Sequence, residues 1–159
     1  MDSERRFARG FIWGVVATVA MSVLMVIGLV TGLAPMPRPV PVALVGETIG
    51  GGPEPLIMAV AMAAHLAYGG VWGGVFASLV RPVTVGKGLA LGVGLWLLMQ
   101  VAVLPYLGWG LFGAAVTPAI AAATLALHLV YGATYGALAR RRAAAVAHDD
   151  TGVRAERVV

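Results

Sequence analysis

The distribution of charge along the chain is the feature that most constrains its fold. Residues 10–37, 55–80 and 88–139 contain no Asp, Glu, Lys or Arg. A helix that crosses the hydrocarbon core of a bilayer needs roughly 20 apolar residues. Each of the first two runs is long enough for one such helix, and the third is long enough for two. The sequence therefore predicts an all-α polytopic membrane protein whose four transmembrane helices form a bundle.

The composition excludes several other classes of protein. Charged residues make up 11% of the chain and hydrophobic residues 60%, whereas about 25% charged residues is typical of soluble domains. There is no cysteine, which excludes disulfides and cysteine-ligated metal sites. The net charge is +4, but the basic residues stand at the ends of apolar runs and form no patch with aromatic residues. Nucleic acid is therefore not an expected partner.

The boundaries of the spans follow from the flanking charges and prolines. We place a transmembrane domain at residues 10–142, after a cytoplasmic N-terminus at residues 1–9. The segment 143–159 is charged and lacks a sustained apolar stripe, so we expect a flexible cytoplasmic tail. Pro105 either ends the third span or kinks it. The four spans are predicted at about residues 10–33, 56–80, 87–105 and 116–139.

Basic residues are distributed unequally between the two predicted sides of the membrane. With four spans, both termini lie on one side, and Arg38 is the only basic residue on the other. Cytoplasmic loops carry the excess of Lys and Arg, so the sequence predicts a multi-pass protein of the cell membrane with cytoplasmic termini. The basic residues on the side of the termini are Arg5, Arg6, Arg9, Arg81, Lys87, Arg140, Arg141, Arg142, Arg154 and Arg157.

The first outer loop, about residues 34–55, has an unusual composition. It begins with a segment in which prolines alternate with other residues, and it ends with three consecutive glycines and a proline. Between these segments, residues 42–49 are long enough for two helical turns. We expect a short helix there, lying on the outer surface with its aliphatic residues toward the lipid or the bundle.

A motif that occurs twice suggests an internal repeat. The pattern His-Leu-x-Tyr-Gly-x-x-aromatic-Gly begins at His65 in the second span and again at His128 in the fourth. The first and third spans match more loosely, with Gly10 corresponding to Gly88 and Gly14 to Gly92. The sequence thus predicts a tandem duplication of a two-helix hairpin, with two parallel copies related by an axis along the membrane normal.

From Gly10 to Leu138 the chain resembles a family of uncharacterised prokaryotic four-helix integral membrane proteins of unknown function. The resemblance rests on the segment Gly14-Val15-Val16-Ala17-Thr18-Val19-Ala20-Met21, on the Pro- and Met-rich outer loop that ends in glycines, and on the histidine motif of the second span. It implies the four-helix fold. It implies no activity and no site residues.

Glycines spaced by four recur in every predicted span. Such faces let helix backbones approach closely in lipid, which predicts a tight bundle. The alternative is that some of these faces pair with a second copy of the chain or with other membrane subunits. The glycines expected to pack in this way are Gly10, Gly14, Gly69, Gly73, Gly88, Gly92, Gly132 and Gly136.

The two histidines are the only strongly ionisable side chains inside the predicted spans, and such groups are candidates for function. Tyr68 and Trp72 share a helical face with His65, as Tyr131 and Tyr135 do with His128. One hypothesis is therefore a haem b held by two axial histidines, with these four aromatic residues around it. A variant uses one histidine and one methionine, either Met21 or Met99.

Two other interpretations of the histidines stay open. In the first, each neutral imidazole bonds a hydroxyl or amide on a neighbouring helix and serves only packing. The second is proton handling or recognition of a polar ligand. The expected hydrogen-bond partners for the packing role are Thr18, Ser22, Gln100 and Thr124.

The sequence shows no sign of catalysis. The spans contain no carboxylate pair, and the chain has no Walker loop and no dinucleotide-binding motif. We therefore expect no catalytic residues and no metal site apart from the haem hypothesis. The leading expectation is a non-enzymatic module that packs in the bilayer or binds membrane partners. The alternatives are a haem b electron carrier and a small transport or channel unit that works as an oligomer.

Overall fold

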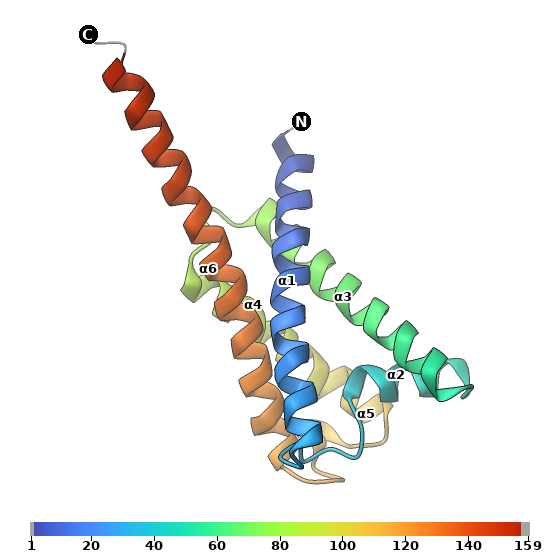
Figure 1. Ribbon diagram of the computed structural model, residues 1–159. Helices are drawn as coiled ribbons and strands as arrows, with labels where there is room; N and C mark the ends of the chain where they lie inside the picture. The colour runs from blue at the N-terminus through green and yellow to red at the C-terminus, as the bar shows by residue number, and fades with distance from the viewer. Residues whose placement is uncertain (1, 157–159) are drawn as a thin grey trace.

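The computed structural model describes the backbone of residues 2–156 and the side chains of residues 3–140 (Figure 1). All regular elements in this part of the chain are helical. In chain order they are α1 (Asp2–Val30), α2 (Val40–Ile49), α3 (Glu54–Leu79), α4 (Val85–Leu98), the π-helix η1 (Met99–Val103), α5 (Leu104–Tyr106), the 3₁₀-helix η2 (Leu111–Gly113) and α6 (Ala119–Glu156).

Within the described residues, four helical segments are long and apolar enough to cross a membrane. They are Ser3–Val30, Glu54–Leu79, Val85–Tyr106 and Ala119–Arg140. Many large apolar side chains point outward from the bundle, among them Ile12, Val23, Met58 and Val101, which are all more than half exposed. Exposure of such side chains to water would cost about 25 cal/mol per Å² of apolar surface. This surface suits a lipid environment.

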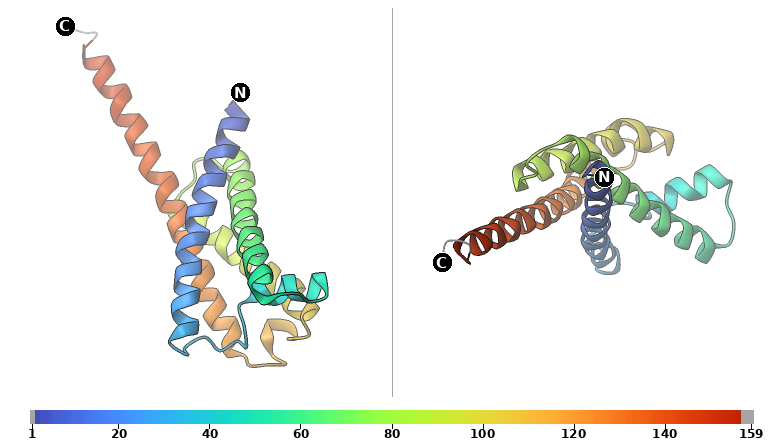
Figure 2. Two further views of the ribbon diagram at one scale, coloured as in Figure 1. Left: turned by 45° about the vertical axis from the view of Figure 1, so that its right-hand side comes forward. Right: turned by 90° about the horizontal axis from the view of Figure 1, so that it is seen from above.

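The start of α1 and the end of α6 lie at the same end of the bundle (Figures 1 and 2). The connection between α3 and α4 lies at this same end. The short helices α2, α5 and η2 lie at the opposite end. This arrangement agrees with an even number of membrane crossings.

The first helix begins earlier and ends earlier than the predicted span. Residues 2–9, expected as a flank, continue α1 toward the N-terminus. The helix stops at Val30, because Gly32 adopts a left-handed conformation with φ of 72°. The N–H of Ala34 then donates to the carbonyl of Gly28 at 2.9 Å, which satisfies an otherwise free carbonyl at the helix end.

Pro105 does not end the third span. The helix continues through η1 to Tyr106, and the N–H of Leu104 donates to the carbonyl of Met99, five residues earlier. Proline lacks an N–H, and its ring clashes with the carbonyl four residues before it in a regular α-helix. A widened π turn just before Pro105 accommodates the ring, and such turns are frequent at functional sites.

The fourth span also differs from its predicted limits. It begins at Ala119, because Pro118 suits the start of a helix and not its interior. α6 then continues past residue 139 to Glu156, so the backbone of residues 143–156, where we expected a flexible tail, is helical. Flexibility of the tail stays a prediction, and its residues 157–159 lie outside the described part of the chain.

A short helix does form in the loop between α1 and α3. α2 starts at Val40, two residues before the predicted limit, with Pro41 in its first turn. It ends at Gly50, whose φ of 74° is the left-handed conformation of a helix C-cap. α2 packs against α3.

The long helices pack mainly as two pairs, α1 with α3 and α4 with α6, and α1 also packs on α6. Glycines lie at both paired interfaces. A Cβ on Gly14 would lie 3.0 Å from the Cα of Gly70, and a Cβ on Gly88 would lie 3.0 Å from the Cα of Gly136. Both would lie closer still to backbone carbonyl oxygens, those of Gly69 and Gly132. These faces are thus occupied within a single chain.

Substitution of these glycines should destabilise the bundle. We expect Gly132→Leu and Gly69→Leu each to lower the free energy of unfolding by about 1–3 kcal/mol, because the interface has no room for the added side chain. A Cβ at Gly132 would meet the backbone of Gly88 and Leu89, and a Cβ at Gly69 would meet the side chains of Thr18 and Tyr131. Gly94 on α4 has no atom within 4 Å of its Cβ position, so Gly94→Leu is the matched control. Thermal unfolding in detergent measures the effect. Equal melting temperatures for all three variants would contradict the proposed packing.

Candidate functional site

A cavity of about 420 Å³ lies inside the bundle, toward the end that carries α2. Its volume falls within the roughly 300–1,000 Å³ of typical small-molecule sites. α1, α3, α4 with η1, and α6 all contribute to its wall. The segment from Met36 to Val45, which includes the first half of α2, closes it from the end of the bundle. The lining is largely apolar.

The cavity opens between α3 and α4. α3 packs on α1 and α4 packs on α6, but α3 and α4 make no extensive contact with each other. The lining residues with exposed side chains all lie on them or on η1: Ala64 and Tyr68 on one side, Leu98 and Ala102 on the other. All four lie within spans that can cross a membrane. If these helices cross a bilayer, the opening faces the lipid.

His128 lines the cavity from α6 and has a defined orientation. Its Nδ1 lies 2.8 Å from the carbonyl oxygen of Thr124, one turn earlier on the same helix. A carbonyl oxygen only accepts hydrogen bonds, so Nδ1 carries the hydrogen and donates. In the neutral ring, Nε2 is then an acceptor with a free lone pair. Among the described residues, Nε2 has no hydrogen-bond partner.

His65 lines the cavity from α3, on a different wall. Its Nε2 is buried and has no partner among the described side chains and backbone groups. A buried polar atom of this kind usually has a partner, and its absence calls for an explanation such as a bound molecule. The structure thus brings the two predicted histidines to one shared cavity.

Neither histidine makes the predicted hydrogen bond across helices. Thr18 donates to the carbonyl of Gly14 on its own helix, and Thr124 donates to that of Ile120. The amide of Gln100 donates to the hydroxyl of Thr124 at 2.9 Å. In the described part of the chain, Ser22 Oγ and Gln100 Oε1 are also buried without a hydrogen-bond partner, and the Nε2 atoms of both imidazoles have none.

Four methionines also line the cavity. Met21 and Met25 come from α1, Met36 from the loop before α2, and Met99 from η1. Met21 and Met99 are the two residues considered as alternative haem ligands. Methionine side chains are flexible and polarisable, and they adapt to apolar partners of different shape.

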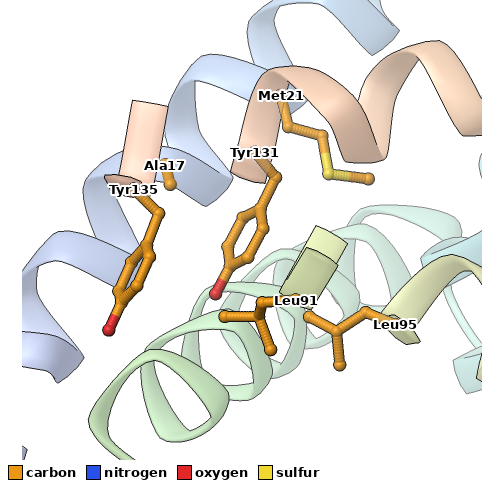
Figure 3. Packing of buried hydrophobic residues seen from close by; sticks show 6 residues of the cluster. All are labelled: Ala17, Met21, Leu91, Leu95, Tyr131 and Tyr135. Atoms are coloured by element: carbon orange, nitrogen blue, oxygen red, sulfur yellow. The ribbon is translucent and has the colours of Figure 1, made fainter. Parts of the chain in front are cut away.

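The other aromatic candidates pack in the core and do not line this cavity. Tyr131 and Tyr135 stack on each other with ring centroids 6.2 Å apart, beside Met21 and Leu95 (Figure 3). Their hydroxyls donate to the carbonyls of Gly69 and Gly73 on α3, at 2.8 and 2.7 Å.

Trp72 packs against the same cluster. Of the four predicted aromatic residues, only Tyr68 lies at the cavity. The cavity therefore has both histidines of the expected haem site, but three of its four expected aromatic residues do not line it.

Residues 4–150 match the model of a family of unknown function, DUF6789. The chain belongs to this family. No curated protein and no solved structure matches the chain. The family match extends over every element that lines the cavity of this DUF6789 protein, but it assigns no activity to it.

Sequence reasoning missed the contribution of α2 to the site. Val40 and Leu44, like Pro41 and Val45, are four residues apart and line the cavity from one side of this helix. The helical spacing of these apolar residues is visible in the sequence. The sequence does not show that this face of α2 closes the cavity at the end of the bundle.

Proposed function

We propose that this protein is a non-enzymatic membrane protein that binds a lipid-soluble ligand in the cavity between α3 and α4. The observation that supports this proposal most directly is the position of the opening. It lies between Tyr68 and Leu98, within segments that can cross a membrane, so a bilayer around these helices would place hydrocarbon at the opening. Molecules dissolved in the bilayer reach such an opening directly, whereas water-soluble molecules do not.

The lining supports the same proposal. Apolar side chains make up most of the wall, and the polar groups are few: the two imidazoles, Tyr68 and Thr124. Small-molecule sites generally combine an apolar wall with a few polar groups that orient the ligand. The four methionines give this wall the adaptability that an apolar ligand requires.

The packed core argues against a transport path through a single bundle. Tyr131, Tyr135, Met21 and Leu95 form a buried cluster, and Met21 and Leu95 also line the cavity. The hydroxyls of both tyrosines are fixed by hydrogen bonds to α3. This cluster separates the cavity from the end of the bundle that carries the chain termini, so the channel alternative would need a path between several copies.

A haem b electron carrier is the second candidate, and the orientation of His128 favours it. Imidazoles that ligate metals commonly donate their other N–H to a carbonyl, which fixes the free nitrogen toward the metal. His128 has this arrangement, and His65 offers a second free nitrogen. Haem also carries two propionates, however, and the residues that line the cavity include no Lys or Arg. We therefore rank haem below a neutral lipid-soluble ligand.

We also propose cytoplasmic termini, α2 at the outer surface of the membrane, and an origin by tandem duplication. Similar contacts in the two helix pairs support the duplication. Gly10 approaches Gly73, and its counterpart Gly88 approaches Gly136. The charge asymmetry supports the orientation, since Arg38 lies near α2 and Arg81 and Lys87 flank the connection between α3 and α4.

The orientation is tested with reporter fusions. A green fluorescent protein fused after Val159 should fluoresce, and alkaline phosphatase at the same position should be inactive, because ten basic residues lie on the side of the termini. Fusions after Gly51, in the predicted outer loop, serve as the opposite control. Phosphatase activity at the C-terminus would reverse the orientation.

The cavity is tested by filling its opening. We expect a photoreactive diazirine probe with a C16 alkyl chain, added to the purified protein, to label peptides that contain Met21 or His65. Ala64→Trp places a bulky ring at the opening and should abolish this labelling. Ala63 is also exposed on α3 but does not line the cavity, so Ala63→Trp should label like the wild type. Equal labelling of both variants, or no labelling of cavity peptides in the wild type, would refute the proposal.

The haem candidate is tested by an absorption spectrum of the protein purified from cells supplied with haem. Our preferred proposal expects no Soret band. A Soret band that disappears in both His65→Leu and His128→Leu would instead establish the second candidate. Met62→Leu, on the exposed side of α3, is the matched control.

A further inference from the structure

The two imidazoles restrict which polar groups the ligand of the cavity can carry. This inference rests on the proposed function. Hydrogen bonding fixes Nε2 of His128 as an acceptor, because its Nδ1 already donates to the carbonyl of Thr124 at 2.8 Å. A ligand that satisfies this nitrogen must supply a hydrogen-bond donor. A carbonyl, ether or ester oxygen cannot do so.

The second imidazole restricts the ligand further. Nε2 of His65 is buried without a partner, and no described contact decides whether it carries the hydrogen. A hydroxyl group both donates and accepts, so it satisfies this nitrogen in either tautomer. The walls offer no charged side chain, which disfavours a ligand with a phosphate, carboxylate or ammonium group.

We propose that the cavity selects lipid-soluble molecules that carry hydroxyl groups, with one hydroxyl donating to Nε2 of His128 and a second polar group bonded to Nε2 of His65. A quinol with an alkyl tail fits this description, since it presents two hydroxyls on opposite sides of one ring. The corresponding quinone presents two carbonyls and cannot bond His128. An aliphatic lipid alcohol presents the same O–H chemistry from another source.

The alternative use of the methionines as metal ligands carries less weight. Thioether and imidazole groups suit Cu(I), and four methionines and two histidines line the cavity. The opening, however, lies between membrane-spanning helices, where a hydrated ion has no access. Entry through lipid favours an uncharged amphiphile.

The experiment uses the full chain in lipid nanodiscs and the C16 diazirine probe described above. A decyl-substituted 1,4-benzoquinol, kept under anaerobic conditions, and the matching 1,4-benzoquinone compete with the probe for the cavity. We expect the quinol to displace the probe at about three- to tenfold lower concentration than the quinone, which corresponds to one net hydrogen bond. 1-Dodecanol and its methyl ether form a second pair, which shows whether an aliphatic hydroxyl is recognised equally well.

Variants separate recognition from folding and from partitioning into the lipid. In His128→Leu, the preference for the quinol over the quinone should fall about three- to tenfold, because the acceptor is gone. Met62→Leu should keep the wild-type ratio. Since each ratio compares the same two compounds, differences in their lipid solubility cancel between variants. In His65→Leu, displacement of the probe should require a quinol concentration that is higher by a similar factor.

Two results would overturn the inference: equal competition by quinol and quinone in the wild type, or an unchanged ratio in His128→Leu. The first needs no variant, so it stands even if His128→Leu fails to fold. If the probe labels the cavity but no hydroxyl compound is preferred, only this inference fails. If the probe does not label the cavity at all, the proposed function fails with it.

Discussion

Close approach of helix backbones at glycines is the interaction on which the rest of the structure depends. At the α1–α3 interface Gly14 meets Gly69 and Gly70, and at the α4–α6 interface Gly88 meets Gly132 and Gly136. In lipid there is little hydrophobic drive for helix association, so contacts of this kind and hydrogen bonds must supply it. The pairs that pack tightly leave α3 and α4 apart, and the cavity occupies the space between them.

The glycines also explain why the tyrosines serve packing. A glycine has no side chain to shield its carbonyl, so the hydroxyls of Tyr131 and Tyr135 reach the carbonyls of Gly69 and Gly73 across the helix interface. These bonds join α6 to α3, two helices that are far apart in the sequence. In α6 the motif thus contains two kinds of residue: His128 lines the cavity, and Tyr131 and Tyr135 pack in the core. In α3 the corresponding Tyr68 lines the cavity with His65.

Long uncharged runs made the four spans predictable, because a bilayer imposes one length on each crossing. The glycines after Ile49 made the end of α2 predictable, but the helix starts at Val40, two residues before its predicted limit. The outer end of the third span was not predictable, since only the π turn at Met99–Val103 decides how Pro105 is accommodated. Helical periodicity grouped His65 with Tyr68 and His128 with Tyr131 on one helical face each, and in the structure both histidines line the cavity. It could not show that Trp72, Tyr131 and Tyr135 turn into packed core, because this depends on which helices pair.

The unequal contacts among the four helices have a mechanical consequence. The α1–α3 pair joins the α4–α6 pair mainly along one line, where α1 meets α6. The contact between α1 and α6 can therefore act as a hinge, and the opening between α3 and α4 lies on the side away from this hinge. A small rotation of one pair about this contact would widen the opening without changing the glycine contacts within each pair, and the hydrogen bonds of Tyr131 and Tyr135 to α3 would limit it. α2, which packs on α3 and lines the cavity, would move together with the α1–α3 pair.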